Sequence, residues 1–67
     1  MESVYKTIEI IGTSEVSWED AAMTAVNTAS KSVRDLRVAE VRELDIKIEN
    51  GKTYFRVKLN VSFKYQE

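Results

Sequence analysis

The sequence predicts a small α+β domain, spanning residues 1–67, in which a three-stranded antiparallel sheet of strand order 1-3-2 wraps around one helix. Its first and last thirds are rich in β-branched and aromatic residues, as strands are. Between them lies an alanine-rich stretch with apolar residues three and four positions apart, which is the spacing of a helix. An Asn50-Gly51 pair then marks a tight hairpin.

The first strand is expected over residues 4–11, which read Val-Tyr-Lys-Thr-Ile-Glu-Ile-Ile. The following Gly12-Thr13-Ser14 is a turn signal and is expected to end it. Ser17 can accept a hydrogen bond from the free amides of a first helical turn, and two acidic residues follow at the positive end of the helix dipole. A helix is therefore expected to begin at about Ser17.

The helix is expected to end between Val33 and Leu36, because its apolar positions continue that far. That apolar face consists of Trp18, Ala21, Ala22, Ala25, Ala29, Val33 and Leu36. Small side chains dominate it, so the helix can lie close to a sheet, while residues such as Asn27 and Lys31 fall on other faces.

The second strand is expected over residues 38–49, with one irregularity. Its apolar residues stand at odd positions up to Val41 and at even positions from Leu44 onward. Strict alternation cannot change faces without a bulge, so one is predicted near Arg42-Glu43. Asn50-Gly51 suits a two-residue type I′ turn, which needs two positive φ angles, and therefore predicts that the third strand runs back antiparallel.

The third strand, residues 53–65, alternates between two faces. Its apolar face consists of Phe55, Val57, Leu59, Val61, Phe63 and Tyr65, and its polar face of Tyr54, Arg56, Lys58, Asn60, Ser62 and Lys64. With the helix between the first two strands, an all-antiparallel sheet places the third strand in the middle. The polar face is left uncovered, open to other subunits or a ligand.

The length of the chain predicts an oligomer. A 67-residue chain buries only roughly 60% of the surface that it exposes when unfolded, so a monomer is marginally stable. Disulfides and structural metals are the other usual remedies, and there is no cysteine or histidine to provide them. The same absence excludes a zinc site of the usual kind and leaves only hard cations, bound by oxygen.

Composition also excludes several classes of function. The net charge is −1 and the two signs alternate, without the basic run that would bind nucleic acid. No apolar stretch suits a signal peptide or a membrane span, so we expect a cytoplasmic protein with no nucleic-acid or membrane partner. Without histidine, cysteine, a phosphate-binding loop or an acid pair of catalytic spacing, we expect no enzymatic activity.

Several short motifs, in order, resemble one family over nearly the whole chain. They are Val4-Tyr5-Lys6, Ile10-Ile11-Gly12-Thr13-Ser14, the alanine-rich helix, Ala39-Glu40-Val41 and the alternating Val57, Leu59, Val61 and Phe63. Their order and spacing resemble the dodecins. The resemblance implies a sheet curled around one helix, a hollow homododecamer, and storage of flavin without catalysis.

Two positions depart from the flavin-binding pattern of that family. In flavin-binding dodecins a tryptophan precedes the Ala-Glu-Val segment and stacks on the flavin ring; here it is Val38. A glutamine of the third strand bonds the edge of the ring; here it is Arg56. An aromatic stack contributes about 0.5–1.5 kcal/mol beyond its buried area, so flavin binding is expected to be weakened or lost.

Arg56 and Trp18 each have two interpretations. Arg56 could pair with Glu40 or Glu43 across the sheet, or face a pocket and hold an anionic ligand. Alternating charges on an exposed antiparallel face favour the ion pair. Trp18 stands at the start of the helix, where a core or subunit contact is favoured over stacking on a ligand.

The Ser-Trp-Glu helix start and the Arg-Val-Ala-Glu strand start resemble the dodecins that lack the flavin tryptophan, some of which bind calcium. A calcium site needs several oxygen ligands, and no segment here has the spacing of an EF-hand loop. Carboxylates meeting across symmetry axes would have to supply them. The candidates are Glu15, Glu19, Glu40, Glu43 and Asp45, each of which could instead be an ordinary surface group.

Three hypotheses remain open on the sequence. The favoured one is a non-enzymatic storage or sequestration shell that binds a small ligand or cation where subunits meet, with classical flavin binding weakened or lost. The alternatives are a structural or protein-interaction module that uses the polar sheet face, and a flavin-binding dodecin with a divergent pocket.

Overall fold

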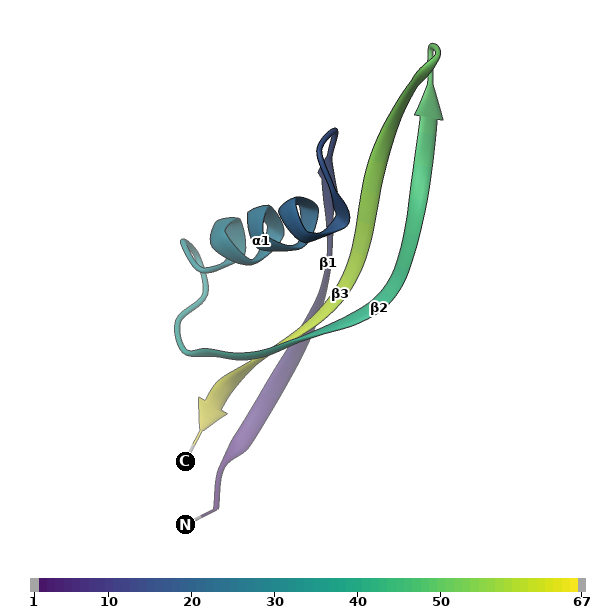
Figure 1. Cartoon of the computed structure of the whole chain (residues 1–67). Coiled ribbons are helices and arrows are strands. Elements are labelled where there is room, and N and C mark those ends of the chain that lie inside the picture. The colour runs from purple at the N-terminus through teal and green to yellow at the C-terminus, as the bar shows by residue number, and fades with distance from the viewer. Residues whose placement is uncertain (1, 67) are drawn as a thin grey trace.

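The computed structural model describes residues 2–66, which form β1 (Val4–Ser14), α1 (Trp18–Ala29), β2 (Leu36–Glu49) and β3 (Lys52–Gln66). The three strands form one sheet of order β1-β3-β2, in which β3 is antiparallel to both neighbours. α1 crosses one face of this curved sheet (Figure 1). The predicted fold class and strand order are confirmed.

The predicted hairpin and bulge are both present. Asn50 and Gly51 have φ angles of 51° and 78°, as a type I′ turn requires, and they set Glu49 opposite Lys52. The β2–β3 register shifts between Val41 and Glu43, where the apolar parity of the sequence changes. This bulge keeps the apolar side chains of both halves of β2 on the face that carries the core.

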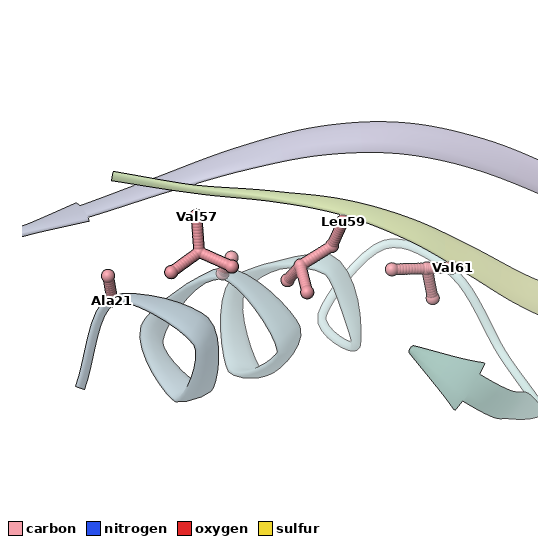
Figure 2. Close-up of a cluster of buried hydrophobic side chains, with 5 residues drawn as sticks. Ala21, Val57, Leu59 and Val61 are labelled. Carbon is pink, nitrogen blue, oxygen red and sulfur yellow. The ribbon is translucent and has the colours of Figure 1, made fainter. Parts of the chain in front are cut away.

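The core lies between α1 and the middle of β3. Val57, Leu59 and Val61 are each 1% exposed and point from β3 towards the helix, as Figure 2 shows. They pack against Ala21 and Ala25 of α1. Burying an aliphatic side chain of this kind contributes about 1.5–3 kcal/mol, so these three residues of the predicted apolar face stabilise the packing of α1 on β3.

The prediction that Gly12-Thr13-Ser14 ends the first strand is wrong, because β1 continues to Ser14. Gly12 pairs with Val57 of β3 and lies beneath α1. A Cβ atom at this position would overlap the carbonyl oxygen of Ala21 and approach the Cβ of Ala25 to 2.9 Å. Glycine is present here to let the helix lie close to the strand, not to turn the chain.

The helix is shorter than predicted, since α1 ends at Ala29 and not between Val33 and Leu36. The Ser30 hydroxyl donates to the carbonyl of Asn27, at 2.7 Å, and the amides of the next two residues bond three positions back. Serine competes with helical hydrogen bonding in this way. Leu36 instead begins β2 and packs against the core from the sheet.

The helix covers the sheet unevenly. Its contacts fall mainly on β1 and β3, and the β2–β3 hairpin extends past it (Figure 1). The protomer is correspondingly elongated, with principal extents of 51 × 20 × 15 Å. Within the described chain, no helix combines the length and the apolar character that crossing a bilayer requires.

Candidate functional site

The polar face of the sheet, opposite α1, carries a bidentate ion pair between Arg56 and Asp45. Arg56 Nε donates to Asp45 Oδ1 at 2.7 Å, and its Nη2 donates to Oδ2 at 2.9 Å. The two residues are directly opposite each other on β3 and β2. The predicted ion pair of Arg56 is therefore present, but the expected partners, Glu40 and Glu43, are wrong.

Glu43 and Glu40 have other partners. Lys58 Nζ lies 3.0 Å from Glu43 Oε1 and 4.0 Å from Glu9 Oε1, so it bridges β2 and β1 across the central strand. Glu40 Oε2 lies 3.4 Å from Arg42 Nη1. Each acidic candidate of β2 thus already lies beside a cation.

The ion pairs shift the pKa values of their members. The hydrogen bonds from Arg56 are the main cause that lowers the pKa of Asp45 below its ordinary value of 3.8. The same bonds raise the pKa of Arg56. The hydrogen bond to Glu43, aided by the charges of Glu43 and Glu9, raises the pKa of Lys58 above 10.5. At neutral pH Asp45, Arg56 and Lys58 therefore stay charged.

Glu9, Arg42, Glu43 and Lys58 line a polar hollow of about 330 Å³. Its two carboxylates are balanced by two basic side chains, so it offers no net negative charge to a cation. Within residues 2–66, no three acidic side chains converge as a metal site requires.

Val38 and Arg56 are far apart within one protomer. Val38 is opposite Ser62, and Arg56 stands six positions earlier on β3. At about 3.3 Å per residue, the two backbone positions are about 20 Å apart. Val38 is largely exposed on the polar face. One chain therefore does not bring these two predicted ligand positions together.

The start of α1 carries the other two acidic candidates. The Ser14 hydroxyl donates to Asp20 at 2.6 Å, and the Ser17 hydroxyl accepts from the Asp20 amide, which caps the helix as predicted. Glu15 and Glu19 are exposed beside this cap, and within residues 2–66 neither forms an ion pair. Among the five candidates, they are the two that no basic side chain of the described residues neutralises.

Trp18 ties the helix start to the sheet. Its indole N–H donates to the carbonyl of Asp45 at 3.1 Å, and its ring meets that of Phe55 edge to face, with centroids 5.0 Å apart. The indole also forms one wall of a mostly apolar cleft of about 290 Å³. The cleft is lined by Trp18, Glu19, Ala22, Val41, Leu44 and Val57.

The sequence reasoning missed Lys58 and Glu9 as members of the charged network, and it named Asp45 as a candidate cation ligand without identifying Arg56 as its partner. The sequence does contain the information that predicts which residues of β2 and β3 face each other. A two-residue turn at Asn50-Gly51 sets Asp45 opposite Arg56 by counting back along both strands.

Comparison with known proteins gives concordant matches. The family model described as Dodecin matches residues 4–66. The chain is 57% identical over 63 residues to the calcium dodecin of Mycobacterium tuberculosis, covering 92% of this chain and 89% of that protein. It is 40% identical over 68 residues to the dodecin of Thermus thermophilus, covering 100% and 99% of the two chains.

Solved structures agree with this protomer. The crystal structure of the M. tuberculosis calcium dodecin, described as having a novel calcium-binding site, has a TM-score of 0.87 at 55% identity over 96% of this chain and 93% of that one. The dodecin from Streptomyces davaonensis has a TM-score of 0.90 at 26% identity over 100% of both chains. The predicted resemblance is confirmed: this chain belongs to the dodecin family.

Proposed function

We propose that this protein is a non-enzymatic dodecin that sequesters a hard cation, calcium, at contacts between its subunits, and that its affinity for flavin is much weaker than in flavin-binding members. The resemblance to the calcium dodecin supports the choice of ion. The homododecamer is the assembly expected of the family. A cytoplasmic location stays a prediction.

The observation that carries the flavin half of the proposal is the bidentate pair between Arg56 and Asp45. Arg56 stands where the flavin-binding pattern has a glutamine, and both of its bonded nitrogens are engaged within the protomer. A ligand that used Arg56 would have to displace a carboxylate held by two charge-assisted hydrogen bonds. Val38 removes the aromatic stack as well, so both contacts are changed.

The choice of cation ligands within the proposal depends on which candidate carboxylates have no basic side chain beside them. Calcium takes about six to eight oxygen ligands, several of them from carboxylates. Glu40, Glu43 and Asp45 each lie beside a basic side chain of their own protomer. A cation would have to compete with those side chains, whereas it would meet no such competition at Glu15 and Glu19. These two residues are therefore the strongest ligands among the five candidates, together with oxygens of a second protomer.

Calcium titration followed by thermal unfolding tests the cation half. An ion that binds only the native protein raises its free energy of unfolding by about 2.7 kcal/mol at a concentration 100 times the dissociation constant. We expect the melting temperature to rise with calcium and to return when a chelator is added. Magnesium, at the same concentration and ionic strength, is the control for general screening of charge.

Matched variants locate the site. Glu15→Gln combined with Glu19→Gln is expected to abolish the calcium-dependent rise in melting temperature, because it removes the two free carboxylates. Glu40→Gln combined with Glu43→Gln removes the same formal charge and is expected to retain that rise. No rise in the unaltered protein at millimolar calcium would refute the cation site, and loss of the rise only in the second variant would move it to β2.

A further inference from the structure

Asn50 and Gly51 form the exposed tip of the β2–β3 hairpin, beyond the part of the sheet that α1 covers (Figure 1). Apart from its two chain neighbours, no residue has an atom within 4 Å of a Cβ built on Gly51. Within residues 2–66, no group forms a hydrogen bond with the side-chain amide of Asn50. This amide is therefore free to rotate towards its own backbone.

An asparagine followed by glycine can react with the backbone of its own chain. The glycine nitrogen attacks the side-chain carbonyl carbon, a C–N bond forms, and the bond from that carbon to the amide nitrogen breaks. Ammonia leaves with the proton of the glycine nitrogen. Water then opens the resulting cyclic imide at either carbonyl, which gives aspartate or isoaspartate. Glycine favours the attack because it has no Cβ atom to obstruct it.

The other two asparagines of the chain lack these features. Asn27 lies inside α1, and Asn60 lies on the central strand, opposite Glu9 and Glu40. The residue after each is β-branched, a threonine or a valine, and crowds its own backbone nitrogen. The helix and the sheet also hold both backbones in regular hydrogen bonding. Asn27 and Asn60 therefore serve as comparisons for Asn50 within the same chain.

The conformation of the turn determines what the reaction requires. Asn50 has a φ of 51°, in the left-handed region, so its peptide bond to Gly51 must rotate before the glycine nitrogen can reach the side chain. That rotation disturbs the pairing of Glu49 with Lys52 and leaves the core beneath α1 in place. Exposed tips of this kind open locally at a small cost in free energy. The reaction can therefore proceed in the folded protein, although more slowly than in the unfolded chain.

We propose that Asn50 is a site of spontaneous covalent modification, at which loss of the side-chain amide gives isoaspartate or aspartate and loosens the tip of the hairpin. Isoaspartate continues the chain through its side-chain carbon, which lengthens the backbone of a turn that fits only two residues. Either product also adds a negative charge beside Glu49, which already pairs with Lys47 at 3.6 Å. The modification accumulates with the age of the molecule and does not depend on what the protein binds.

Tryptic mapping measures the reaction, because cleavage after lysine and arginine places each asparagine in a different peptide. These peptides span residues 7–31, 48–52 and 59–64. The purified full-length protein is incubated in mildly alkaline buffer, either folded or in guanidinium chloride, and then digested briefly in slightly acidic buffer to prevent further reaction. Mass spectrometry follows the loss of amide from each peptide. An isoaspartyl methyltransferase with labelled S-adenosylmethionine detects the isoaspartate, because it methylates the carboxyl group that the rearrangement frees.

In the folded protein we expect Asn50 to lose its amide at least about 10-fold faster than Asn27 or Asn60, because only the nitrogen of Gly51 is unobstructed. Gly51→Asp tolerates the positive φ but places a side chain beside that nitrogen, so it is expected to slow the loss at Asn50 by about 10-fold. Asn50→Gly retains the type I′ turn and is expected to abolish isoaspartate formation. Circular dichroism checks that each variant is folded.

Loss at Asn50 within about 3-fold of that at Asn27 and Asn60 in the folded protein would overturn the proposal, since the closed turn would then block the reaction. An unchanged rate in folded Gly51→Asp would also overturn it. Hydrogen exchange of aged and fresh protein tests the effect on the hairpin. We expect faster exchange in peptide 48–52 of the aged protein, and equal exchange would contradict the loosening of the tip.

Discussion

Gly12 is a residue whose role depends on a single missing atom. Because a Cβ there would overlap the Ala21 carbonyl oxygen, Gly12→Ala must push α1 away from β1. Overpacking of this kind costs about 1–3 kcal/mol, so we expect the free energy of unfolding to fall by that amount in a urea titration.

Gly51 provides the control, because no atom lies within 4 Å of a Cβ built there and only its φ of 78° restricts it. Gly51→Asn, which tolerates positive φ, is expected to cost less than Gly12→Ala. Equal losses in the two variants would show that α1 can move away from β1 freely.

The ion pair of Asp45 with Arg56 makes the stability of the fold depend on pH. Its pKa is lowered in the folded protein, so the pair stabilises the fold fully above the ordinary value of 3.8 and loses that effect as pH falls through the lower folded value. Asp45→Asn is therefore expected to weaken the acid dependence of the melting temperature below about pH 4. A melting curve for Asp45→Asn that falls as steeply with acid as that of the unaltered chain would assign the dependence to other carboxylates.

At the scale of elements, the faces of the strands follow from the sequence because side chains in a strand alternate between two faces. The Asn50-Gly51 turn fixes which residues of the two strands that it joins are opposite each other. The odd-to-even change near Arg42 likewise predicts the bulge. Counting from the turn also yields the Asp45 pairing that the sequence reasoning overlooked.

The ends of β1 and α1 could not be predicted in the same way. Gly12 resembles a turn residue until the helix above it is known, and Val33 and Leu36 continue a helical spacing although the chain leaves the helix at Ser30. The close approach of α1 explains why β1 continues through Gly12, and the local hydrogen bond of Ser30 to the Asn27 carbonyl accompanies the end of α1. The candidate cation ligands pose the same problem at a larger scale, because their convergence depends on geometry between protomers.

Val38, near the start of β2, and Arg56, on β3, lead to a prediction about the affinity for flavin. Val38→Trp together with Arg56→Gln restores the flavin-binding pattern and frees the ring-edge position from Asp45, so riboflavin affinity should rise at least about 10-fold, or about 1.4 kcal/mol. Fluorescence quenching of riboflavin measures it.

Val38→Phe with Arg56 unchanged is the partial control, since it restores an aromatic ring but leaves the ion pair intact. It should give a smaller gain in riboflavin affinity than the double variant. No gain in the double variant would mean that the pocket between subunits has changed shape, so that the two side chains are not what limits flavin binding.

At the scale of the whole molecule, the short chain predicts that the protein associates into an oligomer. The structure shows which apolar residues one protomer leaves uncovered. On the core side of the sheet, β2 exposes Val41, Leu44, Ile46 and Ile48, because α1 packs mainly over β1 and β3. The polar face, in contrast, satisfies much of its charge internally through Arg56 and Lys58. Apolar side chains are therefore what the protomer leaves uncovered on its core side, and under the proposed function Glu15 and Glu19 supply the cation ligands.

Native mass spectrometry of the purified, unaltered protein, with calcium and riboflavin added together at equal concentration, tests the central claim most directly. We predict a species of about 92 kDa, twelve times the 7.7 kDa of one chain, that carries calcium and no riboflavin. A twelve-chain species loaded with riboflavin and free of calcium, or a monomer that binds neither, would contradict the account.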